Sequence, residues 1–481
     1  MPFEHDHWIL PNEIENVLSY NLNDVKATKK FYWLSKDLVD LRKKLGRKYN
    51  LNLINHNDPK IGQEIFGREI ARRKGWSYYS LRDMRTYRSS INLGECVLPD
   101  IAFESKEFNK ILEFFKNTTI ITTYKAFEQS VIYKGFKYDY GTGGLHGCID
   151  SGVYEADDTY DIVDIDVRGY YADVGISNNF YPKHLGQEFV EVYKGFVEMK
   201  NQAGRDKDFV TKAAMKLTNN SVYGKSNDQY SLFYDPVYTM KICINGQLLL
   251  SMLAETLVDE MEDITVLQVN TDGITIKMLN TGHNQLDLIC NDWEKKTSLV
   301  LEYANYSKMV IRDVNNYLAI TTDGKAKPKG AFEVIPMQNG AIAYNKNWSM
   351  RVVPKAIHAF YLHGTPINEF VYNHQDIYDF AIGFRSKGDW DVYYTSIQNN
   401  EKVKEKQQKT IRYYMSKQGG ALTKQNRVDN RVISIESSRT AKLFNQYVEL
   451  PMKDYAIDYE YYITQANKII NAVDDGQLKL F

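Results

Sequence analysis

The sequence of 481 residues has only four cysteines, and they lie far apart, at positions 96, 148, 243 and 290. Without a Cys-x-x-Cys pair, neither a disulfide scaffold nor a zinc ribbon is expected. Also missing is an apolar run of about 18 residues, the length that a membrane-spanning helix needs. No basic stretch followed by an apolar one marks a secretory leader at the start. These absences favour a protein of a reducing cytoplasm.

The net charge is close to zero, because 60 basic residues nearly balance 61 acidic ones. This balance does not decide whether the partner is a polyanion, because phosphate is bound by local clusters of charge. Between Glu401 and Lys442, eleven Lys and Arg residues accompany four acidic ones and two tyrosines, and a second basic stretch runs from Lys26 to Arg88. Such stretches are typical of surfaces that follow a nucleic-acid backbone or of solvated basic helix faces.

The length predicts about three or four structural units. Apolar spacing of three to four residues predicts helices over Glu13–Leu45, about Gln187–Asn201, Asp208–Tyr223 and Asn245–Met261. Alternation of β-branched and polar residues predicts strands at Tyr160–Val167, twice within Thr265–Lys277, near Met309–Thr321 and at Ala331–Ile335. A mostly helical part is expected from Pro354 to about Asn471, and the glycine-rich Tyr140–Gly147 is expected to be the clearest domain boundary. The fold class is therefore predicted to be α+β.

Asp166 ends a predicted strand, in the segment Asp-Ile-Asp-Val-Arg-Gly-Tyr-Tyr. A carboxylate where a strand opens into a loop is held rigidly and stays accessible, as a metal ligand must be. Asp164 lies on the same face of the strand and is a competing candidate. Capping of the strand or of a turn is the alternative role.

Asp272 lies at the tip of a predicted hairpin, just before Gly273. Asp-Gly is also the pair that two-residue hairpin turns prefer, so a purely structural role is the alternative. A metal role requires a second carboxylate, and Asp166 is the partner that we expect. Two Mg²⁺ ions about 3.5–4 Å apart would then bind the attacking and leaving oxygens of a phosphoryl transfer.

A third candidate segment runs from Lys216 to Gly224. On a helix, Lys216, Asn220 and Tyr223 are spaced i, i+4 and i+7 and project from one face. A cation, an amide and an aromatic ring there could meet the triphosphate, the base edge and the base plane of a nucleotide. An exposed helix face with a glycine C-cap is the alternative.

In this order, the three segments resemble those of family B DNA polymerases, most of all the phage-encoded members. Asp166-Val-Arg-Gly-Tyr-Tyr171 resembles motif A (Asp-x-x-Ser-Leu-Tyr), and Asn270-Thr-Asp272 resembles motif C (Asp-Thr-Asp). The segment from Lys216 to Gly224 matches motif B (Lys-x-x-x-Asn-Ser-x-Tyr-Gly) without a departure. Gly169 and Tyr170 replace the usual Ser-Leu, and Asn270 replaces the less essential aspartate of motif C. The resemblance covers nearly the whole chain.

The resemblance implies a right-hand fold: an antiparallel palm sheet (140–186 and 226–345), short two-helix fingers (187–225) and a mainly helical thumb (346–470). It implies two Mg²⁺ ions as cofactor, with Mn²⁺ as a substitute, bound by Asp166, Asp272 and the main chain of Val167. The incoming dNTP would contact Lys216, Asn220, Tyr223 and, at a looser spacing, Lys200. Tyr171 would be the steric gate that excludes a 2′-hydroxyl.

Primer-template DNA is the implied partner. The residues that we expect to contact it are Tyr317, Lys329, Arg412 and Lys424. Asn315 and Asn316 stand where the family has a lysine-rich primer-contacting motif, so their roles do not carry over. The short spacings between the motifs leave no room for the insertions of protein-primed relatives, and a nucleic-acid primer is therefore expected.

The N-terminal resemblance is partial. Tyr20-x-x-x-Asp24 resembles the third motif of the 3′–5′ exonuclease, in which the aspartate binds a metal, and only about nineteen residues precede it. Residues 1–45 are therefore expected to be a remnant of the exonuclease domain, followed by a basic region at 46–139. The other nuclease carboxylates are missing, so no intrinsic proofreading is expected. Either the chain is a truncated product, or a separate exonuclease chain supplies the missing carboxylates.

The tail (471–481) ends in Gln477-Leu478-Lys-Leu480-Phe481, which resembles the peptide that docks on bacterial sliding clamps. Leucines and a phenylalanine on a free tail are costly to expose unless something covers them. Folding of the tail onto its own thumb is the alternative.

The sequence thus predicts a primer-dependent, template-directed, replicative DNA polymerase, in the cytoplasm of a bacterial host if a phage encodes it. The alternative is a catalytically silent DNA- and clamp-binding subunit of a split polymerase, and the intact Asp166, Lys216, Asn220 and Asp272 argue against it. An RNA-synthesising palm enzyme is disfavoured because Tyr171 occupies the gate position.

Overall fold

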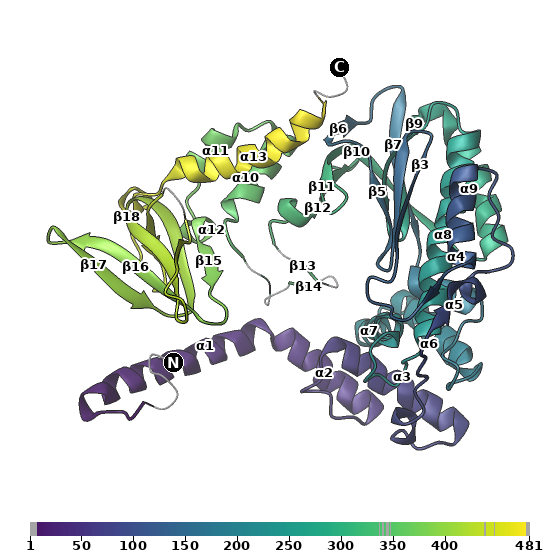
Figure 1. Cartoon of the computed structure of the whole chain (residues 1–481), viewed down its shortest axis with the longest axis horizontal. Helices are drawn as coiled ribbons and strands as arrows, with labels where there is room; N and C mark the ends of the chain where they lie inside the picture. The colour runs from purple at the N-terminus through teal and green to yellow at the C-terminus, as the bar shows by residue number, and fades with distance from the viewer. Residues whose placement is uncertain are drawn as a thin grey trace. The chain divides into compact units, whose positions relative to one another are not determined.

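The computed structural model describes residues 7–335, 337–338, 341–342, 346, 348–436, 439–446 and 448–477 (Figure 1). The chain divides into two compact units, of which unit 1 comprises residues 1–149 and 157–305, and unit 2 comprises 150–156 and 306–481. Each unit has a hydrophobic core of its own. Both contain helices and antiparallel sheets, which confirms the predicted α+β class.

Unit 1 is built on a sheet of antiparallel neighbours. Its strands, in spatial order, are β7 (Tyr160–Val167), β9 (Gly273–Leu279), β8 (Thr265–Asn270), β5 (Gly144–Cys148), β4 (Phe136–Gly141) and β3 (Glu128–Tyr133). Ile162, Val163 and Ile165 of β7 are almost fully buried, and such β-branched side chains fit a pleated, packed surface. The strands predicted at 160–167 and within 265–277 are confirmed.

Nine described α-helices belong to unit 1. They are α1 (Ile14–Leu34), α2 (Lys36–Tyr49), α3 (Asp58–Lys74), α4 (Lys106–Lys116), α5 (Tyr170–Ser177), α6 (Glu188–Arg205), α7 (Phe209–Ser226), α8 (Pro236–Glu260) and α9 (His283–Thr297). Figure 1 shows α4, α8 and α9 on one face of the sheet. One short ladder, β1 (Ile91–Asn92) with β2 (Thr119–Ile120), completes the unit.

Helix α8 is the central helix of unit 1. It begins at Asp235, whose carboxylate accepts a hydrogen bond from the N–H of Val237, and Pro236 occupies its first turn. Among the described helices it is the one long and apolar enough to cross a membrane, and most of its apolar window is buried inside the protein.

Helices α6 and α7 pack against each other and against α3. The α3–α7 contact is very close, because a Cβ at Gly62 would lie 2.3 Å from Oγ of Ser221. Phe66 of α3 meets Phe189 and Phe196 of α6 at ring-centroid distances of 5.0 and 5.4 Å. The two helices predicted here are confirmed.

Unit 2 contains two larger groups of paired strands, one two-stranded ladder and four described α-helices. Strand β10 (Leu301–Asp313) begins in unit 1 and ends in unit 2, where it pairs with β6 (Gly152–Glu155) and β11 (Asn316–Thr321), and β11 pairs with β12 (Ala326–Lys329). The other sheet has the order β15 (Ile382–Arg385), β18 (Thr410–Asn426), β16 (Trp390–Gln398), β17 (Glu401–Gln407), with β19 (Val432–Ser434) and β20 (Ala441–Leu443) also on β18. The helices are α10 (Val352–His363), α11 (Ile367–Asn373), α12 (Ile377–Phe380) and α13 (Tyr459–Gln477), and β13 (Met337–Gln338) pairs with β14 (Ala341–Ile342).

The prediction of a mainly helical C-terminal part is wrong, because a six-stranded sheet fills residues 382–443. In strand β17, Lys402, Lys404 and Lys406 lie at every second position and are exposed. The strand therefore lacks the alternation of apolar and polar residues by which a strand is usually predicted. The β16–β17 turn is Asn399-Asn400, with φ of 49° and 65°, a conformation that asparagine tolerates in tight hairpins.

Two further expectations are wrong. The glycine-rich Tyr140–Gly147 is the β4–β5 hairpin inside the sheet of unit 1, with Gly141 paired to Gly144, so its glycines mark a tight turn rather than a domain boundary. The strand expected at Ala331–Ile335 is replaced by a 3-10 turn, Gly330–Phe332. Gly330 has φ of 60°, which breaks the extended backbone at this point.

The fold predicts a loss of stability in acid. Burial lowers the pKa of His184, whose Nε2 donates to the carbonyl of Leu232 at 2.8 Å while Nδ1 contacts the hydroxyl of Thr86 at 2.9 Å. The unfolded chain therefore binds more protons than the folded chain below about pH 6.5, and stability falls as the pH falls, by at most about 1.4 kcal/mol per pH unit for this group.

In a His184→Gln variant, the melting temperature should fall less between pH 7.5 and 5.5 than it does in the parent chain. His363 is exposed, and His363→Gln is the matched control. An equally steep pH dependence in the His184 variant would contradict the assignment.

Candidate active site

The register of β7 on β9 brings the two predicted aspartates together. Asp166 pairs directly with Gly273, the residue after Asp272. The N–H of Val167 donates to the carbonyl of Asp272 at 2.7 Å, so a main-chain bond ties the two segments at this point. The turn between β8 and β9 is Thr271-Asp272, with Thr271 at φ of 56°. Gly273 already belongs to the ladder, so the turn pair is Thr-Asp instead of Asp-Gly.

Gly273 is required by the carboxylate of Asp166. A Cβ at position 273 would lie 1.9 Å from Oδ1 of Asp166, closer than any two such atoms can approach. The backbone of Gly273 has an ordinary φ, so the constraint is steric and not conformational. The missing side chain therefore leaves the space that the Asp166 carboxylate occupies.

Asp164 and Asp166 have separate roles. The hydroxyl of Thr275 donates to Oδ1 of Asp164 at 2.6 Å across the ladder, and Asp164 is half-buried. Asp166 is exposed at the end of the strand. The geometry favours Asp166 as the accessible carboxylate and gives Asp164 a cross-strand structural bond.

The donor set fits Mg²⁺. Mg²⁺ is usually held by one or two carboxylates together with phosphate oxygens and water. Asp166 and Asp272 could provide the two carboxylates, and the carbonyl of Val167, the residue after Asp166, could add a main-chain oxygen. Within the described residues no group of three or more His, Cys, Asp or Glu side chains forms a protein-only metal site.

Two aromatic rings stack beside the carboxylates. Tyr171 of α5 and Tyr223 of α7 have centroids 3.9 Å apart and planes inclined by 9°. Burial, followed by the charges of Cys243 and Asp272, raises the pKa of Tyr171 to about 12. Burial also raises the pKa of Tyr223. Both hydroxyls are therefore neutral at physiological pH, and the charge of Asp272 acts on Tyr171, so this ring lies near Asp272.

The neighbouring Tyr170 fixes where α5 begins. Gly169 has φ of 60° and precedes the helix, and Tyr170 is buried against α8. A Cβ at Gly246 would lie 2.2 Å from the hydroxyl of Tyr170, so the glycine in α8 admits that ring. With Tyr170 locked into the core, the next residue, Tyr171, faces the carboxylate side.

Lys216 and Asn220 lie on the exposed side of α7, two turns and one turn respectively before the half-buried Tyr223. The predicted common face is therefore confirmed. Lys200 of α6 is half-buried, and its charge acts on Asp173 of α5. The structure thus brings Lys200 near the start of α5, although its sequence spacing is loose.

A cavity of about 300 Å³ adjoins Tyr223 and Gly224 of α7. It is lined by Thr123, Tyr124, Lys125, Thr142, Tyr223, Gly224, Asn227, Thr239 and Met240. Polar side chains, one lysine and an exposed tyrosine suit a nucleobase and its phosphate.

The expected DNA-contacting residues of unit 2 form two groups. Tyr317 and Lys329 are cross-strand partners on β11 and β12, so the structure brings them together on one face. Asn316 binds Asp313 through Nδ2 at 2.8 Å and accepts from the N–H of Ala331, which gives it a structural role. Arg412 and Lys424 lie far apart on β18 and have different neighbours.

Arg412 is exposed and lines a groove of about 710 Å³ together with Lys346, Tyr378, Gly383, Phe384, Arg385, Gln408, Thr410, Ile411, Phe444 and Asn445. The ammonium of Lys424 lies 4.9 Å from the centroid of Trp390. On β17, the ammonium of Lys404 lies 4.2 Å from the ring of Tyr393. Cations interleaved with aromatic rings are typical of nucleic-acid surfaces.

Tyr20 and Asp24 lie on α1, a helix of 21 residues in which no residue is buried. Gln477 is the last residue of α13. Leu478, Leu480 and Phe481 of the clamp-like peptide lie outside the described residues.

Two features near the site were not predicted from the sequence. Asp173 is half-buried, and burial raises its pKa although Arg168 and Lys200 oppose the shift. His146 of β5 contacts the hydroxyl of Thr271 in the β8–β9 turn at 3.2 Å. Asp173 lies two positions after Tyr171, so the motif A resemblance could have pointed to it. The contact of His146 with Thr271 depends on the order of the strands in the sheet, which cannot be predicted from a local sequence pattern.

Neither a family model nor a curated protein matches the sequence. Among solved structures, the family B DNA polymerase from the hyperthermophilic archaeon Pyrobaculum calidifontis is similar, with a TM-score of 0.45 and 13% sequence identity. The alignment covers 97% of this chain and 57% of that chain, so this chain spans little more than half of its length. The function is therefore inferred from the side chains themselves.

The geometry predicts that Gly273→Ala displaces the carboxylate of Asp166 and weakens Mn²⁺ binding by about tenfold, because one of two carboxylate ligands moves away. Isothermal titration with Mn²⁺ measures the effect. Gly282→Ala is the matched control, since a Cβ there would meet nothing closer than 3.4 Å. Unchanged Mn²⁺ affinity in the Gly273 variant would show that Asp166 is not a ligand.

Proposed function

We propose that this chain is a DNA-directed DNA polymerase, which adds deoxynucleotides to a primer 3′-hydroxyl and releases pyrophosphate. The observation that carries the proposal is the β7–β9 register, which places Asp166 opposite Gly273 and beside Asp272. The motif resemblance of the same residues supports it, as does the stack of Tyr171 on Tyr223 beside them.

The chain's own residues would act mainly by positioning. Asp166, Asp272 and the carbonyl of Val167 would hold two Mg²⁺ ions, which supply electrostatic stabilisation of the developing phosphate charge. Lys216 and Lys200 would bind the triphosphate, and Asn220 and Tyr223 would line the nascent base pair. The Tyr171 ring, fixed by its stack, would fill the space that a ribose 2′-hydroxyl needs.

Primer-template DNA would bind Tyr317 and Lys329, the groove at Arg412, and the lysine and aromatic face near Lys424. The clamp-like tail, Gln477, Leu478, Leu480 and Phe481, would tether the chain to a bacterial sliding clamp and raise processivity through effective concentration. Deletion of the last five residues should abolish clamp binding in a pull-down with purified clamp, and unchanged binding would refute this part.

We also propose that Tyr20 and Asp24 of helix α1 contribute to a 3′–5′ exonuclease site. Helix α1 exposes apolar side chains along its length, among them Leu18, Leu22 and Val25, and helices of this kind are usually stabilised by packing. In any preparation of the protein that shortens a primer, Asp24→Ala should abolish the shortening. Undiminished shortening would exclude Asp24 from the nuclease site.

The alternative is a catalytically silent DNA-binding and clamp-binding subunit. It would keep the basic surfaces of unit 2 but would not require Gly273, the accessible Asp166 or the tyrosine stack. The two functions make opposite predictions for synthesis by the purified chain.

Primer extension with Mg²⁺ and all four dNTPs tests the proposal. Asp166→Asn and Asp272→Asn should each lower the extension rate by at least about a hundredfold, because each removes charge that stabilises the transition state. Asp164→Asn is the matched control on the same strand and should retain most of the rate. No extension by the parent chain, despite tight binding of the primer-template, would favour the silent subunit.

Sugar selectivity tests the role of Tyr171. Tyr171→Ala should raise incorporation of rNTPs relative to dNTPs by at least about tenfold, because the ring that fills the 2′ position is gone. Tyr171→Phe keeps the ring and its stack on Tyr223, so it should keep the selectivity. The ratio of kcat/KM for rNTP and dNTP measures both variants, and an unchanged ratio in Tyr171→Ala would remove Tyr171 from the gate.

A further inference from the structure

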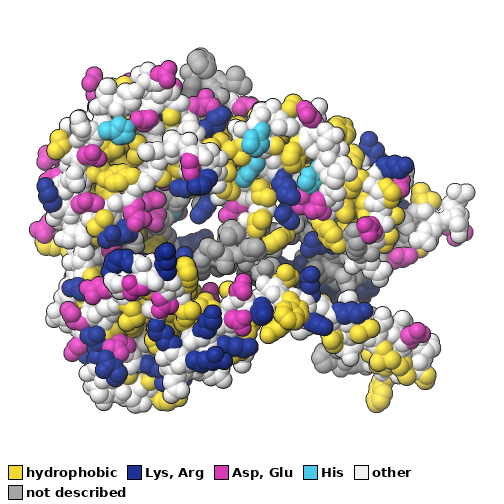
Figure 2. All heavy atoms as spheres, turned by 180° about the vertical axis from the view of Figure 1, so that it is seen from behind, with side chains coloured by type: hydrophobic (Ala, Val, Ile, Leu, Met, Phe, Trp, Pro, Cys, Tyr) yellow, Lys and Arg dark blue, Asp and Glu magenta, His cyan; other side chains and the backbone are white. Residues whose placement is uncertain are grey.

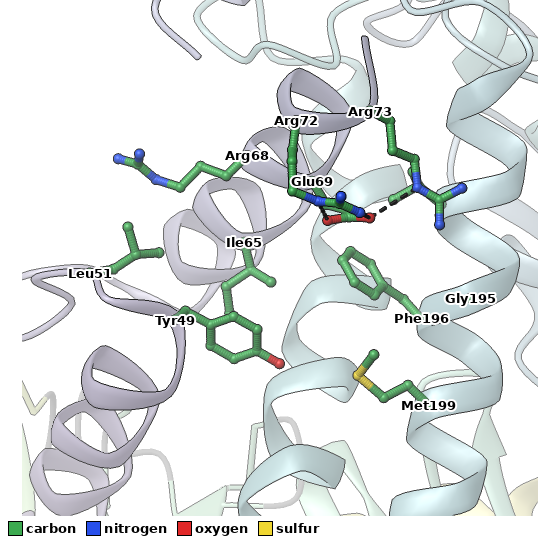
Figure 3. A pocket seen from close by; sticks show the side chains of 11 residues that line it. Tyr49, Leu51, Ile65, Arg68, Glu69, Arg72, Arg73, Gly195, Phe196 and Met199 are labelled. Atoms are coloured by element: carbon green, nitrogen blue, oxygen red, sulfur yellow. Dashed lines mark hydrogen bonds and ion pairs between the residues drawn. The ribbon is translucent and has the colours of Figure 1, made fainter. Parts of the chain in front are cut away.

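A second pocket in unit 1 has no part in the proposed synthesis. It has a volume of about 300 Å³ and lies between the end of α2, helix α3 and helix α6 (Figure 3). Its lining residues are Tyr49, Leu51, Ile65, Arg68, Glu69, Arg72, Arg73, Val192, Gly195, Phe196 and Met199. None of them is among the residues assigned to the metal, the nucleotide or the DNA.

The floor of the pocket is apolar and adaptable. Figure 3 shows Tyr49 directed toward Phe196 and Met199 of α6, with Ile65 of α3 on the same side. Phe196 and Ile65 are almost fully buried, whereas Met199 is 41% exposed at the mouth. Branched aliphatic side chains and a flexible methionine form walls that adapt to a bulky side chain of a partner.

The rim of the pocket is basic. Three guanidinium groups, from Arg68, Arg72 and Arg73, and one carboxylate, from Glu69, lie around it. Glu69 accepts from Arg72 at 2.7 and 2.8 Å and from Arg73 at 2.9 Å, which holds both arginines at the mouth. The Arg72 side chain remains 71% exposed, so its outer face can still pair with an anion. Figure 2 shows many Lys and Arg side chains, with Asp and Glu side chains among them, at the lower left of the molecule.

A glycine keeps the pocket open. Gly195 lies in the middle of α6, where glycine is less favourable for a helix than almost any other residue. Nothing lies within 4 Å of a Cβ built at this position, and its φ is not positive, so neither packing nor backbone conformation requires the glycine. The space that any larger side chain would enter is the pocket itself.

One polar atom in the wall lacks a partner. The hydroxyl of Tyr49 is buried and makes no hydrogen bond to the described residues. Burial raises the pKa of Tyr49, so its hydroxyl keeps its proton and remains able to donate. A carbonyl of a bound ligand would satisfy it.

We propose that this pocket binds an acidic peptide segment of a partner protein, which inserts one bulky apolar side chain between Tyr49, Phe196 and Met199. Acidic residues on both sides of that anchor would pair with Arg68, Arg72 and Arg73, and a peptide carbonyl would accept from Tyr49. Arginine, tyrosine and methionine around a small apolar pocket are the composition of interface hot spots. Single-stranded DNA fits less well, because bases stack on open aromatic faces, and the rings here are sunk among aliphatic walls.

The test is fluorescence anisotropy with the full chain and three labelled heptapeptides, with Phe, Leu or Trp at the centre and three acidic residues on each side. At least one peptide should bind saturably, and its counterpart with Ala at the centre should bind at least about tenfold more weakly. Gly195→Leu fills the pocket without a clash at its Cβ and should weaken binding by at least about tenfold. Gly204→Leu, on the same helix outside the pocket, is the matched control.

Arg72→Glu should weaken binding to a similar degree, with Arg205→Glu, on exposed α6 surface outside the pocket, as the control. Circular dichroism melting verifies that each variant is folded. Absence of saturable binding by all three peptides would overturn the proposal, as would equal binding by Gly195→Leu and the parent chain. Binding of labelled oligo(dT) that Gly195→Leu abolishes, with no peptide binding, would assign the pocket to single-stranded DNA and also overturn it. Primer extension is not used as a readout, so this test is independent of the proposed synthesis.

Discussion

The antiparallel register of β7 on β9 places the carboxylate of Asp166 over the bare backbone of Gly273, one residue after Asp272. A shift of one residue would turn Asp166 to the other face of the sheet and separate the pair. The register is specified by buried branched residues on both strands, such as Ile165 paired with Ile274. The hydrophobic core of unit 1 therefore sets the spacing of the two carboxylates.

The face proposed to bind the nucleotide, which includes Tyr171 and Tyr223, also depends on the core of unit 1. Tyr170 is locked against Gly246 of α8, which turns Tyr171 toward the carboxylates, and α7 brings Tyr223 to stack on it. Helix α7 is in turn held by its close contact with α3 and α6. A rigid scaffold under exposed polar groups is what catalysis by positioning requires.

Much of this arrangement could be predicted from the sequence. Strand β7, the β8–β9 hairpin and helices α6 and α7 have strong local periodicity, so their positions and the common face of Lys216, Asn220 and Tyr223 were predictable. The proximity of Asp166 and Asp272 was expected from the motifs, but the role of Gly273 depends on a cross-strand approach that no local pattern reveals.

The six-stranded sheet of unit 2 was not predicted, because its sequence carries little periodic signal. In strand β17, Lys402, Lys404 and Lys406 are exposed, and Val403 is the only apolar residue between them, so its alternation carries little apolar signal. The pocket at Gly195 was also unpredictable, because it is formed by three helices whose packing is decided by tertiary contacts.

The most direct measurement is Mn²⁺ binding, by electron paramagnetic resonance, to the ternary complex with primer-template and a non-hydrolysable dNTP analogue. The account predicts two bound Mn²⁺ ions per chain, and at least about tenfold weaker binding of Mn²⁺ when either Asp166 or Asp272 is changed to Asn. Wild-type stoichiometry and affinity in either variant would contradict the claim that these two aspartates share a metal site.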